Sequence, residues 1–174
     1  MRGNAFAASG RLPEPSPIAS ANGLSVFSPT FSGQSTVAVI KAALASLNAG
    51  DYVAFLSYLP GTSDVEQTFA EIRMGIRSRF RVASTFGIGP RYLHSTGQYH
   101  KGGPNRALAF VVTGDDETET PIPGAGYSFS VLKRAQALGD AETLAAHGRR
   151  VVRLHLRLKT DVSEIERLFA DALR

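Results

Sequence analysis

Apolar and polar residues follow two different spacings along this chain. In residues 35–50, apolar side chains such as Val37, Ile40 and Leu44 recur every three or four positions, which predicts an amphipathic helix between Ser35 and Gly50. Residues 51–59 are instead an almost continuous apolar run with turn residues on both sides, which is typical of a buried strand. The chain therefore contains both helical and strand patterns within its first third.

The two patterns follow one another to the C-terminus. Ser63 and Glu66 have the spacing of a capping box, which predicts a helix start at Ser63. Further helices are expected over 63–80, 127–140 with an extension to 148, and 161–174, and strands over 24–28, 81–87, 107–113 and 150–159. This alternation predicts an α/β fold, a three-layer sandwich around a mostly parallel sheet.

The N-terminal segment lacks either pattern. Residues 1–23 contain Pro13, Pro15 and Pro17 among many Ala, Ser and Gly residues. We expect residues 1–23 to be a linker or a disordered tail, and residues 24–174 to form one α/β domain.

The strand pattern over 150–159 differs from the others because it is apolar on one face only. Its apolar positions are Val152, Leu154, Leu156 and Leu158, and its polar positions are Arg153, His155, Arg157 and Lys159. A central parallel strand is usually apolar on both faces, so the pattern predicts an edge strand with His155 exposed. The alternative is that the polar face contacts something outside this chain.

Composition and charge narrow the functional classes. The 174 residues include no cysteine, which excludes disulfides and thiolate metal sites, and the net charge is +4. No apolar run approaches the roughly 20 residues that span a bilayer, and the N-terminus has no signal-peptide core, so we expect a cytoplasmic protein without a membrane partner. Basic residues are not interleaved with aromatic ones as a stacking surface requires, so no nucleic-acid partner is expected either.

The most polar stretch follows the predicted strand 81–87. It reads GPRYLHSTGQYHKGGPN, residues 89–105, and we expect an irregular loop. Ligands of open α/β sheets bind beyond the carboxyl ends of strands, and these side chains suit a phosphorylated or polyhydroxylated ligand. The candidate binding residues are Ser95, Thr96, Gln98, His100, Lys101, Gly102 and Gly103, and either His94 or His100 can move protons near neutral pH.

Two other interpretations of this stretch are open. In the first, its polar side chains are structural, capping neighbouring helices and bonding their own backbone. In the second they bind a metal, but two histidines without a carboxylate or Cys are a weak ligand set, so no metal is expected. His147, beside Gly148, is expected at the end of a helix rather than in a site.

Several blocks of the sequence resemble a known family. GPRYLHSTGQYHKGGPN, ALAFVVT, IPGAGYSFSVLKRAQALGD and HGRRVVRLHL occur in the same order as in the C-terminal part of bacterial bifunctional transaldolase/phosphoglucose isomerase fusions. The resemblance runs from about Leu12 to the C-terminus. It implies a sugar isomerase (SIS) fold and the interconversion of glucose 6-phosphate and fructose 6-phosphate by ring opening and enediolate proton transfer, without a metal or organic cofactor.

By the same resemblance, His94 matches the histidine that assists ring opening in phosphoglucose isomerases. Gln98, His100 and Lys101 are then expected to line the substrate site, although His100 lies one residue closer to His94 than the family pattern has it. The E-S-x-G-K-like segment that holds the family's glutamate is absent, and so is F-D-Q-x-x-V-E-x-x-K, so Lys133 is not assigned as the family lysine.

These missing motifs imply an incomplete enzyme. We expect the C-terminal portion of a glucose-6-phosphate isomerase that needs an upstream isomerase lobe or transaldolase domain as its partner. The alternatives are a non-catalytic sugar-phosphate-binding or regulatory module, and a scaffold with a structural loop. A lobe without its partner should expose apolar surface, so self-association into a homo-oligomer is also expected.

Overall fold

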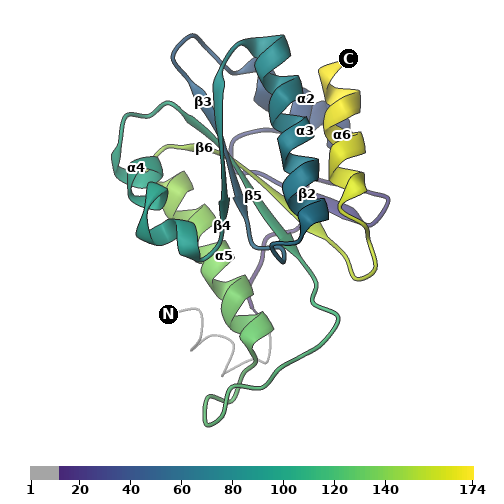
Figure 1. Cartoon of the computed structure of the whole chain (residues 1–174), viewed down its shortest axis with the longest axis vertical. Helices are drawn as coiled ribbons and strands as arrows, with labels where there is room; N and C mark the ends of the chain where they lie inside the picture. The colour runs from purple at the N-terminus through teal and green to yellow at the C-terminus, as the bar shows by residue number, and fades with distance from the viewer. Residues whose placement is uncertain (1–11) are drawn as a thin grey trace.

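The computed structural model describes residues 12–174, which build a six-stranded sheet flanked by helices (Figure 1). The strand order is β1-β2-β6-β5-β3-β4, in which β6, β5, β3 and β4 are parallel and β1 and β2 antiparallel. The strands are β1 (Ala19–Ala21), β2 (Leu24–Phe27), β3 (Tyr52–Ser57), β4 (Ala83–Ile88), β5 (Ala107–Gly114) and β6 (Arg150–Leu156). The helices are α2 (Thr36–Ala45), α3 (Ser63–Phe80), the 3-10 helix η1 (Arg91–His94), α4 (Thr96–Gly102), α5 (Phe129–Ala146) and α6 (Ser163–Leu173).

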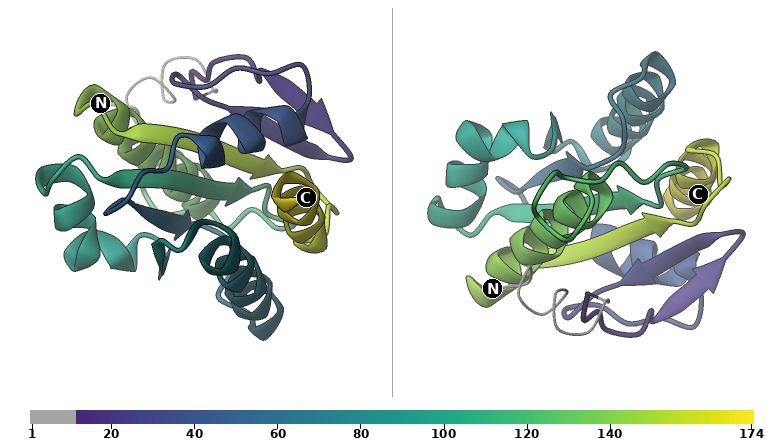
Figure 2. Two further views of the ribbon diagram at one scale, coloured as in Figure 1. Left: turned by 90° about the horizontal axis from the view of Figure 1, so that it is seen from above. Right: turned by 90° about the horizontal axis from the view of Figure 1, so that it is seen from below.

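The helices lie on both faces of the sheet. Helices α2, α3 and α6 cover one face, and α5 covers the other together with η1 and α4 (Figures 1 and 2). The prediction of an α/β three-layer sandwich with a mostly parallel sheet is therefore confirmed. Among residues 12–174, none of the helices combines the length and apolarity needed to span a bilayer.

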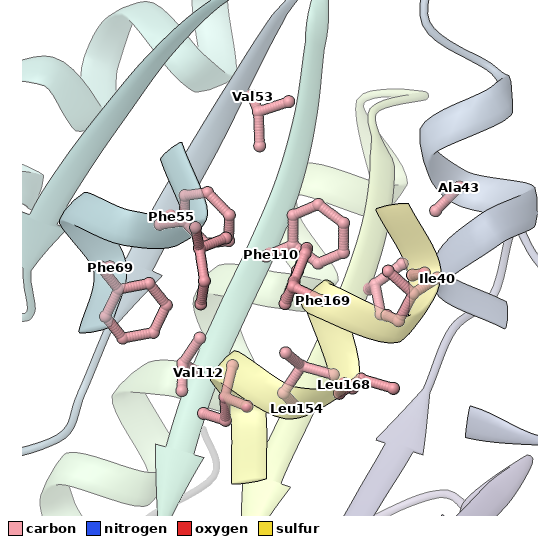
Figure 3. Close-up of a cluster of buried hydrophobic side chains, with 14 of the residues drawn as sticks. Ile40, Ala43, Val53, Phe55, Phe69, Phe110, Val112, Leu154, Leu168 and Phe169 are labelled. Atoms are coloured by element: carbon pink, nitrogen blue, oxygen red, sulfur yellow. The ribbon is translucent and has the colours of Figure 1, made fainter. Parts of the chain in front are cut away.

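The two faces of the sheet carry hydrophobic clusters of different extent. On the α2–α3–α6 face, Phe55, Phe110 and Phe169 meet with ring centroids 5.1 to 5.5 Å apart (Figure 3). Each such aromatic contact adds about 0.5–1.5 kcal/mol beyond the area that it buries. The α5 face has a smaller cluster, in which alanines such as Ala54 and Ala109 lie beside larger residues such as Tyr58 and Leu144. The larger core therefore lies on the α2–α3–α6 face, and α5 covers a smaller cluster on the opposite face.

Side-chain caps set the helix boundaries. The α3 helix begins at Ser63 as predicted, but its N-cap is Thr62, whose hydroxyl accepts a hydrogen bond from the Val65 N–H. The predicted capping box at Ser63 and Glu66 is therefore wrong by one residue. His147 is the C-cap of α5, as its predicted position at a helix end required.

The prediction of an edge strand over 150–159 is wrong. β6 lies between β2 and β5, and His155 is 6% exposed rather than solvent-facing. The polar face of β6 is covered by this chain itself: Arg153 binds Glu14, and His155 bonds Thr113. A one-sided polar pattern here marks a central strand with a buried ionic face.

The described part of the N-terminal segment is more structured than a linker. β1 pairs with β2, and the Ile18 N–H donates to the Val26 carbonyl at 2.9 Å. The Glu14 side chain contacts both α5 and β6. Residues 1–11 of the expected tail lie outside the described residues.

Exposed large apolar side chains are dispersed over the described part of the chain. Ile18, Met74, Tyr99, Phe129 and Leu158 are each 38% to 55% exposed, and they belong to five different segments. Self-association of the chain remains a prediction.

Candidate functional site

Residues 89–105 form two short helices rather than the irregular loop expected from their composition. The segment leaves the carboxyl end of β4, forms η1 and α4, and returns to the amino end of β5. Gly89 at its start lies against the ring of Tyr58, where an added Cβ would come within 2.7 Å of ring carbons. The segment is thus packed closely on the sheet from its first residue.

A chain of buried polar groups anchors this segment to α5. The Tyr58 and Tyr92 hydroxyls lie 3.3 Å apart, and the Tyr92 hydroxyl donates a hydrogen bond to Asp140 Oδ2. Lys101 Nζ forms an ion pair with Asp140 Oδ1 at 2.5 Å, and the Asp140 side chain is 2% exposed. Burial raises the pKa of Tyr58 to about 12, and burial together with the Asp140 charge raises the pKa of Tyr92 further. Both tyrosines therefore stay protonated at neutral pH.

His100 belongs to the same buried side of the segment. It is 2% exposed, and its Nδ1 shares a 2.8 Å hydrogen bond with the Tyr52 hydroxyl at the amino end of β3. Among residues 12–174, its Nε2 has no hydrogen-bond partner. Burial lowers the pKa of His100, although the Asp140 charge opposes the shift, so the imidazole is neutral at neutral pH.

Arg149 holds the end of α4 in place. Its guanidinium donates to three carbonyl oxygens, those of His100 at 3.0 Å, Lys101 at 2.7 Å and Gly103 at 2.6 Å. The last carbonyls of a helix have no intrahelical partner, so a buried arginine satisfies them well. Gly103 is required at this end, because a Cβ there would lie 2.5 Å from the Tyr99 carbonyl.

The other side of the segment faces solvent. His94, Ser95, Thr96 and Gln98 are all exposed, and we call these four residues the η1–α4 face. Within residues 12–174, Ser95 alone among these four has a side-chain hydrogen bond, from its hydroxyl to the Tyr92 carbonyl at 3.3 Å. Gly102 is exposed as well, with open space where a side chain would project.

The structure therefore divides the predicted site residues into two groups. The η1–α4 face is free to meet a ligand, and His94 belongs to it. His100, Lys101 and Gly103 are held in contacts that fix the segment, which is the structural role given above as an alternative. The candidate catalytic and binding roles remain predictions.

Sequence reasoning missed a second polar cluster, which lies at the carboxyl ends of β5 and β6. We call it the Glu14 cluster, and it consists of Glu14, Asp115, Arg134, Arg153 and His155. Each oxygen of the Glu14 carboxylate binds a different arginine, Oε1 to Arg134 at 2.6 Å and Oε2 to Arg153 at 2.9 Å. Asp115 binds the other side of Arg134 at 3.0 Å and His155 Nε2 at 3.1 Å.

The pKa values of Glu14 and His155 both lie below their ordinary values, but for different reasons. Burial raises the pKa of Glu14, but the Arg134 hydrogen bond and the Arg153 charge outweigh it, so that pKa lies below its ordinary value. Burial and then the Arg134 charge lower the pKa of His155. Glu14 is therefore ionised and His155 neutral at neutral pH. The only sequence signal was the one-sided polar face of residues 150–159.

Two open pockets adjoin this cluster. One, of about 500 Å³, is lined by Glu14, Asp115, Arg134 and the first turn of α5. The other, of about 520 Å³, includes Phe129, Asp116 and Lys133, and the last two form an ion pair. Within residues 12–174, no three His, Asp or Glu side chains gather in a way that would hold a metal ion.

Comparison with known proteins supports the fold class. No protein-family model and no curated protein matches this sequence. Among solved structures, the fold is similar to the crystal structure of the hypothetical protein TT0462 from Thermus thermophilus, with a TM-score of 0.62 and 18% identity over 79% of this chain. The match covers 37% of that chain, so the present chain spans little more than a third of its relative. At this identity the likeness establishes a shared α/β architecture alone.

Proposed function

We propose that this chain is the C-terminal lobe of a cytoplasmic glucose-6-phosphate isomerase and contributes the η1–α4 face to a shared active site. The observation that carries the proposal is the division of residues 89–105 into a buried side, which fixes the segment, and an exposed side that bears His94. The sequence resemblance of the same segment to transaldolase/phosphoglucose isomerase fusions supports it independently.

In this proposal each exposed side chain has a chemical task. The imidazole of His94 moves a proton between the ring oxygen and a hydroxyl of the hexose, which opens the ring. Thr96 and Gln98 donate and accept hydrogen bonds to sugar hydroxyls or phosphate oxygens. His100 and Lys101 act as positioning residues, because Tyr52 and Asp140 hold them beneath α4.

The proton transfer between C1 and C2 of the sugar needs a general base, and we assign no residue of this chain to that role. No E-S-x-G-K-like segment occurs in the sequence, so we assign the base to a separate upstream lobe. The isolated chain is then expected to bind substrate weakly and to turn it over only when that lobe is supplied.

An NMR titration tests the binding half of this proposal. We expect fructose 6-phosphate to shift the amide resonances of residues 93–98 more strongly than inorganic phosphate does. The His94→Ala variant should lose the difference, whereas the His147→Ala control, which removes an exposed histidine at the C-cap of α5 and outside the η1–α4 face, should retain it.

Three outcomes separate the hypotheses. Sugar-specific shifts that are lost in His94→Ala, with isomerase activity when the glutamate-bearing lobe is added, support the proposal. Sugar-specific shifts without activity in that mixture indicate the non-catalytic binding module instead. Absence of any shift at millimolar ligand contradicts both and favours a structural role for the segment.

A further inference from the structure

The Glu14 carboxylate occupies a place between two guanidinium groups that belong to other parts of the fold. Arg134 lies on α5 and Arg153 lies on β6, and each binds one carboxylate oxygen. A carboxylate that bridges two arginines resembles the way in which arginines hold a phosphate group, since both anions present oxygens to planar donors. Arg134 and Arg153 therefore have the arrangement of an oxyanion-binding site, and the Glu14 carboxylate fills it.

The cationic half of this site is rigid and buried. The Arg153 side chain is 5% exposed, and its guanidinium carbon lies 3.6 Å from the centroid of the Phe27 ring. A buried guanidinium requires an anionic partner, because its desolvation is otherwise uncompensated. Its strand, β6, is hydrogen-bonded on both sides, so the position of Arg153 does not depend on Glu14.

The anionic half is attached differently. Residues 12–17, which we call the Glu14 segment, belong to no helix or strand. In the described part of the N-terminal region, residues 12 onward, the pairing with β2 starts at Ile18, whose N–H donates to the Val26 carbonyl. The Glu14 segment can therefore leave the sheet without breaking a strand ladder, whereas Arg134 and Arg153 cannot.

The pocket beside this cluster has room for a larger anion next to Arg134. It has a volume of about 500 Å³ and reaches from Glu14 and Arg134 to Ser130 and Val131 in the first turn of α5, and Arg153 is not part of its lining. Its other charged residues are Asp115, Asp116 and Glu119, of which Asp116 is paired with Lys133. Asp115 opposes a dianion there, but it already binds Arg134 and His155.

We propose that Arg134 and Arg153 form a binding site for the phosphate group of a small molecule, and that Glu14 closes this site as an intramolecular substitute for that group. Ligand and Glu14 segment then compete for the same two guanidinium groups. The site lies on β6 and α5, apart from the η1–α4 face beside β4, and does not depend on the isomerase proposal.

Phosphate binding by a Glu14→Gln variant tests this proposal. Glutamine keeps the size of the side chain but removes the competing charge, so the apparent affinity for inorganic phosphate should rise about tenfold. The matched control is Glu71→Gln, which removes the same charge from an exposed position on α3 and should leave the affinity unchanged. Adding Arg134→Gln to Glu14→Gln should abolish the gain.

Each of the other results overturns the proposal. Equal affinities for Glu14→Gln and Glu71→Gln would mean that the site does not bind phosphate. A gain that survives Arg134→Gln would place the phosphate elsewhere. A parallel titration with fructose 6-phosphate shows whether the organic part of a ligand adds affinity at this site. Binding at the η1–α4 face would be detected separately, through amide shifts at residues 93–98.

A measurement on the wild-type protein tests the same proposal without variants that could misfold. Saturating phosphate should shift the amide resonances of Arg134 and Arg153 and, together with them, those of Leu12, Glu14 and Ser16 as the Glu14 segment is displaced. Shifts at the arginines without any change in residues 12–17 would contradict the competition between ligand and Glu14.

Discussion

Two buried ionic clusters flank α5, and they differ in where their charges come from. On one side, Asp140 of α5 pairs with Lys101 and Tyr92, and all three belong to helices. On the other side, Arg134 of α5 pairs with Glu14, which lies outside any helix or strand. Both clusters satisfy buried charge, but only the first has all its members on regular elements. We therefore expect the ion pair of Asp140 with Lys101 to be permanent and that of Glu14 with Arg134 to be exchangeable.

The largest expected loss of stability follows from removing Asp140. Asp140→Ala should lower the free energy of unfolding by about 3 kcal/mol, because Lys101 loses its counter-ion and the buried Tyr92 hydroxyl loses its acceptor. Urea denaturation measures the change. The exposed pair of Asp171 and Arg174 offers a control, and Asp171→Ala should cost less than about 1 kcal/mol. Equal costs for the two variants would show that the Asp140 cluster is not a stabilising element.

Arg149→Lys should have the next largest effect. Lysine keeps the charge but lacks the planar fork that reaches three carbonyl oxygens, so we expect a loss of about 1–2 kcal/mol. Hydrogen exchange should show faster exchange of α4 amides than of α6 amides in this variant. Unchanged protection of α4 would mean that Arg149 does not hold the segment.

The smallest expected loss of stability follows from neutralising Glu14. Glu14→Gln should cost about 1 kcal/mol at neutral pH, since the amide oxygen of glutamine can still accept a hydrogen bond from one of the two arginines while the carboxylate charge is lost. The pKa of Glu14 is lowered in the folded state, so its stabilisation is complete above the ordinary value of 4.5 and is lost as the pH falls through the folded-state pKa. Unfolding measured from pH 7 to pH 3 should therefore bring wild type and Glu14→Gln together at the acid end. A constant difference would show that the Glu14 charge is not the cause.

The two clusters also show which parts of the fold and of the candidate site the sequence could predict. Hydrophobic periodicity located strands β2 to β6 and the longer helices, because each buries a continuous apolar face, as Phe55 and Phe110 do on neighbouring strands. It gave the wrong place for β6 in the sheet, because Arg153 and His155 are buried by partners that are distant in sequence, which local periodicity cannot detect. It also failed to show that His94 and His100 face different environments, because the short helices η1 and α4 depend on contacts with Tyr58, Asp140 and Arg149.

Thermal unfolding with and without phosphate tests the difference between the two clusters most directly. Millimolar phosphate should raise the Tm of Glu14→Gln more than that of wild type, because the ligand replaces the missing carboxylate between Arg134 and Arg153. The same phosphate should give Asp140→Ala no more than the wild-type increment. Equal increments in all three proteins would contradict the account, since neither cluster would then be exchangeable.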